Sequence, residues 1–329
     1  MSFEPFRPRF PWYGRHLQSL RNPLRPAPRL PNGPGRRLAF RLPDGDALQA
    51  CHDAPLERDR AAPSILLIHG LGGCETSNYM LAASAFFTRA GSDVYRLNLR
   101  GAGPSQATCR GWSHAGRHRD LEAVIPELPV GRSGIVAIGF SLGGNLLLNH
   151  LARGAVDDGL RAAASVSAPI DLAAACTVIH APRNRLYHDY LLRALKADYL
   201  NPHSSLTAVE QEAVRFARTL FEVDDRFTAP HHGFGRAEVY YRSASARRYL
   251  DRITRPTLLV HAVDDPFIPP DAYLDAGGPA VTVLLAEGGG HLGFHDRAGL
   301  WHLRQVQRFA KAVPMRSAKD LSARERLCS

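Results

Sequence analysis

The sequence predicts an α/β protein with a mostly parallel, doubly wound sheet and one helical insertion. Short runs of branched apolar residues, typical of strands buried on both faces, alternate along the chain with longer helix-like segments. This alternation is interrupted once, over residues 170–253. The 329 residues are 45% hydrophobic and 22% charged, which is ordinary for a globular protein and excludes disordered, collagen-like and coiled-coil classes.

The elements are expected in the following order. Prolines interrupt an N-terminal arm at 1–35, so no long helix is expected there, although residues 12–20 are apolar enough to pack against the body. A domain should follow over 36–312, and a basic tail over 313–329 should end the chain. Strands are expected over 36–42, 46–52 (a hairpin), 64–70, 92–99, 134–140, 163–168, 257–262 and 280–286. Helices are expected over 77–90, 117–128, 142–153, 270–276 and 296–312.

The segment 170–253 has helical periodicity and holds 10 of the 27 aromatic residues. Open α/β sheets bind ligands at the carboxyl ends of their strands. We therefore expect this segment to form a helical lid over a site at that edge. Extra helices that merely pack on one flank of the sheet are the alternative.

The distribution of charge along the chain argues against a nucleic-acid-binding protein. The net charge of +10 lies in the ends, because residues 1–42 hold nine arginines against Glu4 alone while 43–310 hold 27 bases and 28 acids. A nucleic-acid-binding domain would carry its basic patch on the folded surface, so no nucleic-acid partner is expected. Weak contact of the arm with an anionic membrane surface is an open alternative.

Five scattered cysteines form no C-x-x-C pair, so neither a disulfide framework nor a zinc site is predicted. His114 and His118 have a spacing that suits a metal, but no third ligand accompanies them, and a solvated helix end is the simpler interpretation. There is no apolar run long enough for a membrane span and no secretory leader, so a cytoplasmic location is expected.

The strongest chemical signal is G-F-S-L-G at 139–143, placed directly between a predicted strand and a predicted helix. Strand–turn–helix is the context in which a G-x-S-x-G motif forms a nucleophile elbow. Flanking glycines leave room for the strained turn, which presents the serine hydroxyl above the sheet. Ser141 is therefore the predicted nucleophile.

A serine nucleophile needs a base, and the base needs an orienting acid. In this fold the acid and then the histidine follow the serine along the chain. His291, in the glycine-rich loop after the last strand, is the predicted base. Asp265, in the turn after 257–262, is the preferred acid because Pro266 ends the strand and Ile268 can anchor the turn; Asp264 and Asp171 are alternatives.

Acyl transfer also requires donors for the oxyanion of the tetrahedral intermediate. The backbone N–H of Leu142, after the nucleophile, is one expected donor. The N–H of Leu71, in the loop H-G-L-G-G (69–73), is the other. These glycines lack the G-K-[ST] or G-x-G-x-x-G context of a phosphate cradle, so no nucleotide cofactor is predicted.

Motifs along most of the chain carry a family resemblance. They are H-L-Q-S-L (16–20), H-G-L-G-G (69–73), L-N-L-R-G-A-G-P-S (97–105), H-A-G (114–116) with Asp120, G-F-S-L-G-G-N (139–145), F-T-A-P-H-H-G-F (227–234), Y-Y-R-S-A-S (240–245), H-A-V-D-D-P-F (261–267) and G-G-H-L-G-F (289–294). Together these motifs resemble the YheT-like branch of α/β-hydrolases, which is related to the animal α/β-hydrolase-domain proteins 1 and 3 and to yeast medium-chain ester synthases. The resemblance implies a triad of Ser141, Asp265 and His291 and esterase chemistry on acyl esters. One departure is R-H-R at 117–119, where a less basic stretch is expected.

The sequence thus predicts an α/β-hydrolase fold that acts as a serine carboxylesterase on a small-molecule acyl ester of short to medium chain length, without cofactor or metal. An acyltransferase with the same triad and an alcohol acceptor is one alternative. A non-catalytic binding protein on a hydrolase scaffold is another.

Overall fold

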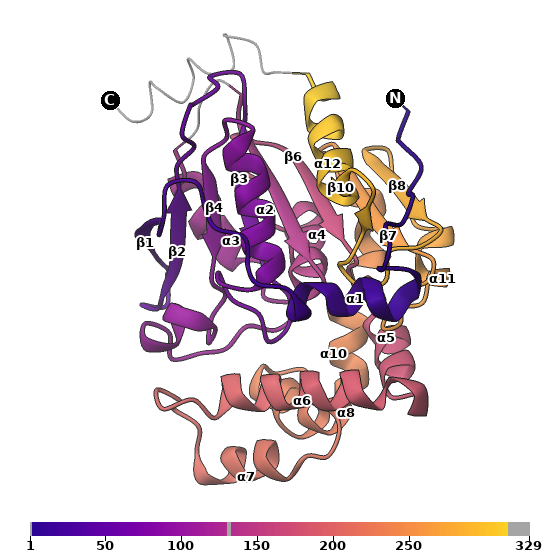
Figure 1. Cartoon of the computed structure of the whole chain (residues 1–329). Helices are drawn as coiled ribbons and strands as arrows, with labels where there is room; N and C mark the ends of the chain where they lie inside the picture. The colour runs from indigo at the N-terminus through magenta and orange to yellow at the C-terminus, as the bar shows by residue number, and fades with distance from the viewer. Residues whose placement is uncertain (1, 130–132, 315–329) are drawn as a thin grey trace.

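The computed structural model describes residues 2–129 and 133–314. In this part of the chain eight strands form one sheet in the order β1-β2-β4-β3-β5-β6-β7-β8 (Figure 1). β1 pairs antiparallel with β2 and β2 with β4, whereas all other neighbours are parallel. The expected mostly parallel sheet is therefore confirmed. The strands are β1 (Arg36–Arg41), β2 (Ala47–Asp53), β3 (Ser64–Ile68), β4 (Val94–Leu97), β5 (Ile135–Phe140), β6 (Leu160–Val166), β7 (Thr257–Ala262) and β8 (Val281–Ala286).

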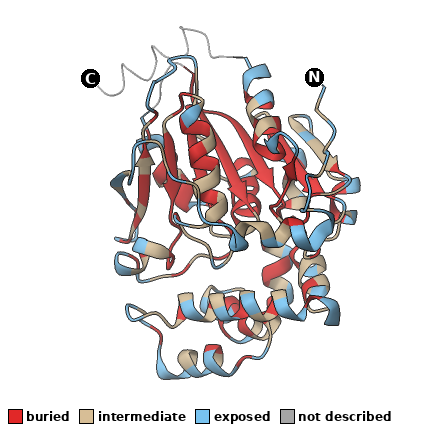
Figure 2. Ribbon diagram, viewed as in Figure 1, coloured by how far each residue is buried: buried red, intermediate tan, exposed pale blue. Residues whose placement is uncertain are grey.

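Helices cover both faces of the sheet, and the central strands between them are buried (Figure 2). Alternate side chains of β3 point to opposite faces, as the strand period requires: Leu66 and Ile68 join one core, and Ile65 and Leu67 the other. The first core is completed by α3 (Asp120–Val124), α4 (Leu142–Arg153) and α11 (Asp271–Leu274), and the second by α2 (Asn78–Arg89) and α12 (Trp301–Ala312).

The insertion between β6 and β7 is helical and lies beyond the carboxyl ends of the parallel strands (Figure 1). It has an apolar core of its own, in which Tyr199 and Phe227 contact Trp112 from the sheet domain. Its helices are α5 (Leu172–Ile179), α6 (Arg185–Tyr199), α7 (Ala208–Phe216), α8 (Leu220–Val223), α9 (Ala229–His231) and α10 (Ala237–Ala244).

Four elements differ most from expectation. β6 begins at Leu160, three residues before the expected range 163–168, and ends two residues before the end of that range. The helix expected over 296–312 begins only at Trp301, because β9 (His295–Asp296) and β10 (Gly299–Leu300) form a tight hairpin. Gly299, directly after the two turn residues, has φ 108°, which favours glycine. The helix expected over 117–128 is limited to α3 and a short 3₁₀ turn, Ile125–Glu127, which contains Pro126. The arm contains the 11-residue helix α1 (Gly14–Leu24), which tolerates Pro23 in its last turn. Most of the expected basic tail, from residue 315, lies outside the described residues.

Candidate active site

Ser141 lies at the sharp turn between β5 and α4, where the motif predicts it. Its backbone angles are φ 50° and ψ −122°, a strained conformation for a residue with a side chain. Close packing explains the two glycines of the motif. A Cβ at Gly139 would lie 2.5 Å from the carbonyl oxygen of Gly143, and a Cβ at Gly143 would collide with the carbonyl oxygen of His69. Larger residues would therefore force the turn open.

His291 reaches Ser141 from the glycine-rich loop after β8. Its Nε2 lies 3.1 Å from Oγ of Ser141, and its Nδ1 lies 2.9 Å from Oδ2 of Asp265. With Nδ1 protonated, the ring donates to the carboxylate and its Nε2 is free to accept the serine proton. The structure thus brings together three residues that lie far apart in the sequence.

The carboxylate of Asp265 is buried and enclosed by hydrogen-bond donors. Its Oδ1 accepts from the backbone N–H of Phe267 at 2.8 Å and of Ile268 at 3.2 Å. Burial alone would raise the pKa of this carboxyl group, but the His291 imidazole and the hydrogen bonds outweigh burial and lower the pKa below its usual value. Asp265 is therefore ionised at neutral pH and can stabilise a positive charge on the ring.

The two alternative acids have other partners. Asp264 Oδ1 accepts from the backbone N–H of Gly290 at 2.8 Å and so holds the loop that carries His291. Asp171 caps α5, where its Oδ1 accepts from the N–H of Ala174 at 3.1 Å. In the described part of the chain, Asp265 is the carboxylate that bonds the imidazole.

The loop that carries Leu71 packs tightly against the serine turn, since a Cβ at Gly70 would lie 2.9 Å from Cβ of Ser141. The N–H of Gly70 donates to the Tyr79 hydroxyl at 3.0 Å. His69 fixes the start of the loop: its Nε2 accepts from the N–H of Leu99 at 3.0 Å, and its Nδ1 lies 2.8 Å from the Gly70 carbonyl oxygen. Burial lowers the pKa of His69 to about 4, which keeps the ring neutral.

Ser141, His291, Leu71 and Leu142 all line one cavity of about 960 Å³. The insertion supplies a large part of its wall, and most of the wall is apolar. Of the aromatic residues in the insertion, the cavity is lined by Tyr187, Tyr190, Tyr199, Tyr240 and Tyr241. Phe216 is instead exposed, and Phe227 lies in the core of the insertion.

The N-terminal arm also reaches the site, which sequence reasoning missed. Ser19 Oγ in α1 accepts from the backbone N–H of His291 at 2.8 Å, and Asn22 Nδ2 donates to the carbonyl oxygen of Leu292 at 3.0 Å. The motif H-L-Q-S-L (16–20), which matches the family, was the available signal for this contact. The sequence alone assigns the motif no chemical role. The positioning contacts of His69 and Tyr79 were missed as well.

His114 and His118 are buried rather than solvated, which corrects the expectation drawn from their spacing. Burial lowers the pKa of both rings. Among the residues that the structure describes, no three His, Cys, Asp or Glu side chains are arranged to hold a metal ion. No helix within the described ranges is long and apolar enough to cross a membrane.

A strained serine after a central strand, hydrogen-bonded to a histidine that follows the last strand, defines the class of protein. Residues 63–298 match the model of the alpha/beta hydrolase fold family, and the chain belongs to that family. Within it, the chain belongs to the branch of YheT of Escherichia coli (strain K12), a relative that bears the name of an esterase. The two are 33% identical over 263 residues, which cover 77% of this chain and 76% of YheT.

Further relatives carry names of lipid-cleaving enzymes. Phospholipase ABHD3 of Mus musculus is 32% identical over 73% of this chain and 59% of its own length, and a monoacylglycerol lipase of Saccharomyces cerevisiae is 29% identical over 84% and 63%. The chain thus spans about three fifths of the length of both proteins. The Pyrococcus furiosus esterase Pf2001 shares the fold, with a TM-score of 0.57 at 13% identity over 94% of this chain and 98% of that one. This chain is an enzyme of the esterase and lipase type.

Proposed function

We propose that the chain is a serine carboxylesterase whose catalytic triad is Ser141, His291 and Asp265. The observation that carries the proposal is the continuous hydrogen-bonded path from Oγ through the imidazole to a buried carboxylate, with distances of 3.1 and 2.9 Å. His291 Nε2 takes the hydroxyl proton as Oγ attacks the ester carbonyl carbon, and Asp265 stabilises the resulting imidazolium.

The attack converts the carbonyl oxygen into an oxyanion. The backbone N–H groups of Leu71 and Leu142 are the proposed donors to it, because both residues line the cavity beside Ser141. Leu142 is also the first residue of α4, whose N-terminal dipole favours negative charge. His291 then protonates the leaving alcohol, and water, activated by the same ring, releases the acid from the acyl-enzyme.

The proposed substrates are esters with short to medium acyl chains, enclosed by the insertion 170–253 acting as a lid. Each methylene buried in an apolar cavity contributes up to about 0.8 kcal/mol, so preference should rise with chain length until the cavity is full. The aromatic content of the insertion suggests an optimum of about four to ten carbons.

The test is a p-nitrophenyl ester series from acetate to palmitate, measured with wild type and Ser141→Ala. We expect kcat/KM to rise and then fall along the series, and Ser141→Ala to lower kcat by about 10⁴ to 10⁶. Residual activity close to wild type in Ser141→Ala would refute the proposal. Product analysis with added ethanol separates hydrolysis from acyl transfer, because an acyltransferase would yield the ethyl ester instead of the acid.

A further inference from the structure

Helix α1 turns its polar face toward the protein. Gln18 is buried, donates through Nε2 to the carbonyl oxygen of His295 at 3.0 Å, and accepts at Oε1 from the N–H of His295 at 2.8 Å. Ser19 and Asn22 bond the same loop at residues 291 and 292. Hydrogen bonds rather than apolar burial therefore fix α1 beside the candidate active site.

The opposite face of α1 is apolar and exposed. Tyr13, Leu17, Leu20 and Leu24 follow one another at i, i+4, i+7 and i+11, a spacing that places them on one side of a helix. Their exposed fractions are 51%, 43%, 36% and 65%, and Phe10, packed edge-on against Tyr13, is 76% exposed. A surface helix of a globular protein usually buries such a stripe, so α1 has the reverse orientation.

This apolar face continues into the rim of the cavity. Leu20 and Leu24 line the cavity, as do Leu186 and Tyr190 of α6, which are 84% and 61% exposed. A hydrogen bond of 3.0 Å between His16 Nδ1 and the Tyr187 hydroxyl connects the two helices. Figures 1 and 2 show α1 and α6 on the same side of the molecule with exposed residues along both. Exposed apolar side chains thus border the entrance from both helices.

Exposed arginines accompany these apolar side chains, both in the arm and beside α6. The acid of the arm, Glu4, is already paired with Arg304 and Arg308. On the α6 side, Arg183 and Arg193 are exposed and line the cavity. The exposed arginines of the arm are Arg7, Arg9, Arg15, Arg25 and Arg29. Apolar side chains beside arginines are the composition of helices that lie in an anionic lipid interface.

We propose that the outward face of residues 10–24, together with the exposed end of α6, docks on an anionic phospholipid surface and takes ester substrates from it directly into the cavity. The inference rests on the proposed esterase function, because it assigns that function a lipid-borne substrate. A second copy of the chain fits this face poorly, since two arginine-rich arms would repel each other.

The intact 329-residue chain is tested by co-sedimentation with phosphatidylcholine vesicles that contain 0% or about 30% phosphatidylglycerol. Arginine contacts with the anionic lipid should add to apolar insertion at the higher content. We expect binding to the anionic vesicles that weakens as salt is raised. The variant Phe10→Ser/Tyr13→Ser/Leu17→Ser should reduce this binding at least about tenfold, because apolar insertion is lost. The matched control is Val209→Ser/Phe216→Ser/Leu274→Ser, whose side chains are 77%, 67% and 66% exposed elsewhere and which should bind as wild type does.

Hydrolysis of a soluble short-chain ester separates this inference from the proposed function. Phe10, Tyr13 and Leu17 do not line the cavity, so the arm variant should hydrolyse p-nitrophenyl acetate at the wild-type rate. Equal vesicle binding by the arm variant and wild type would overturn the inference, as would failure of wild type to bind anionic vesicles. A dimer in analytical ultracentrifugation that the arm variant abolishes would assign the face to self-association instead.

Discussion

Asp264 and Asp265 are adjacent in the chain but have different partners, and this difference is testable. Asp265→Asn should lower kcat on a soluble ester by about 10³ to 10⁴, because the amide leaves the imidazole in the wrong tautomer. Asp264→Asn should cost no more than about tenfold, since its amide oxygen can still accept from Gly290. Steady-state kinetics of both variants and of Asp171→Asn check this. A larger loss at either alternative position would move the acid there.

The positions of these side chains could be predicted from the sequence where local geometry decides them, whereas their catalytic roles stay predictions. The turn at Ser141 follows from its glycines, and the preference for Asp265 follows from a turn in which Ile268 is buried and donates to the carboxylate. The contacts of Ser19 with the His291 loop join residues 272 positions apart. No periodicity or spacing signals such a contact, because it depends on how the arm docks.

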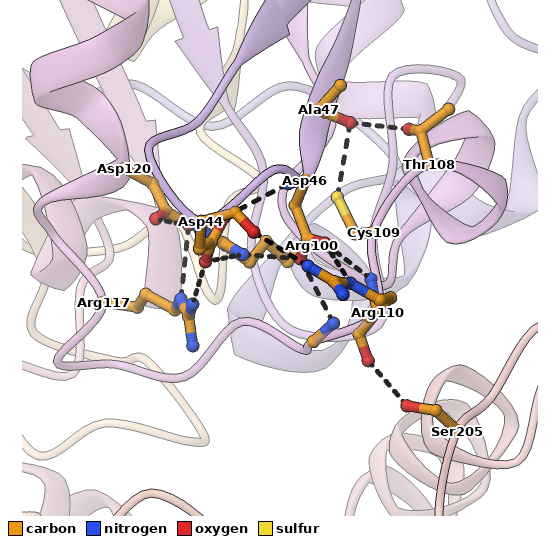
Figure 3. Close-up of polar contacts among 11 residues, drawn as sticks. Asp44, Asp46, Ala47, Arg100, Thr108, Cys109, Arg110, Arg117, Asp120 and Ser205 are labelled. Atoms are coloured by element: carbon orange, nitrogen blue, oxygen red, sulfur yellow. Dashed lines mark hydrogen bonds and ion pairs between the residues drawn. The ribbon is translucent and has the colours of Figure 1, made fainter.

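At the scale of elements, one buried arginine connects three segments of the chain (Figure 3). Arg100 donates to both carboxylate oxygens of Asp120 at 2.7 and 3.0 Å, and its Nη1 lies 2.6 Å from Asp46 Oδ2 and 2.7 Å from Asp44 Oδ2. The hairpin turn between β1 and β2 is thereby tied to α3 and to the loop after β4. That loop also contacts the insertion, because Ser205 donates to the carbonyl oxygen of Arg110.

Removing this arginine should leave the buried carboxylates of Asp46 and Asp120 without their closest cationic partner. Arg100→Met is therefore expected to lower the free energy of unfolding by about 3 to 5 kcal/mol, measured by urea denaturation. Arg255 pairs with Asp158 at 2.6 Å but at the surface, so Arg255→Met should cost less than about 1 kcal/mol. Equal losses in the two variants would contradict a supporting role for the Arg100 cluster.

The boundaries of strands that are continuous runs of buried apolar residues were predicted closely. The buried runs of β5 and β7 begin and end within one residue of the expected ranges. The start of α12 was misplaced because the β9–β10 hairpin has only two residues per strand, which is too short for a periodic signal. The orientation of α1 differs from the expectation that the apolar residues of 12–20 pack against the body. Leu17 and Leu20 are exposed, and hydrogen bonds from the polar face hold the helix instead.

At the scale of the whole molecule, buried histidines should make stability depend on pH. Burial lowers the pKa of His150 to about 4, and it lowers the pKa of His261 to about 4 and of His302 to about 3. In the unfolded chain these rings titrate near 6.5. The unfolded state therefore binds more protons than the folded state between pH 6.5 and 4. The contribution of these rings to the free energy of unfolding is fully present above pH 6.5 and is lost as the pH falls through this window.

The contribution of one ring can be isolated with His150→Leu. Between pH 7.5 and 5 wild type should lose about 2 kcal/mol more unfolding free energy than this variant, because the variant has no ring to protonate. Urea denaturation at both pH values measures the difference. His203→Leu, at an exposed position, is the control and should keep the wild-type dependence on pH. Identical pH dependence in His150→Leu and wild type would refute this explanation.

The central claim is that Ser141 becomes acylated during ester hydrolysis, and covalent labelling tests it most directly. A fluorophosphonate mimics the tetrahedral intermediate and reacts with a serine only when a base and an oxyanion site activate it. Intact-mass analysis of the labelled protein should show one adduct, and peptide mapping should place it on Ser141. Ser141→Ala should take up no label. An adduct on another residue, or an unlabelled wild-type protein that still hydrolyses esters, would contradict the account.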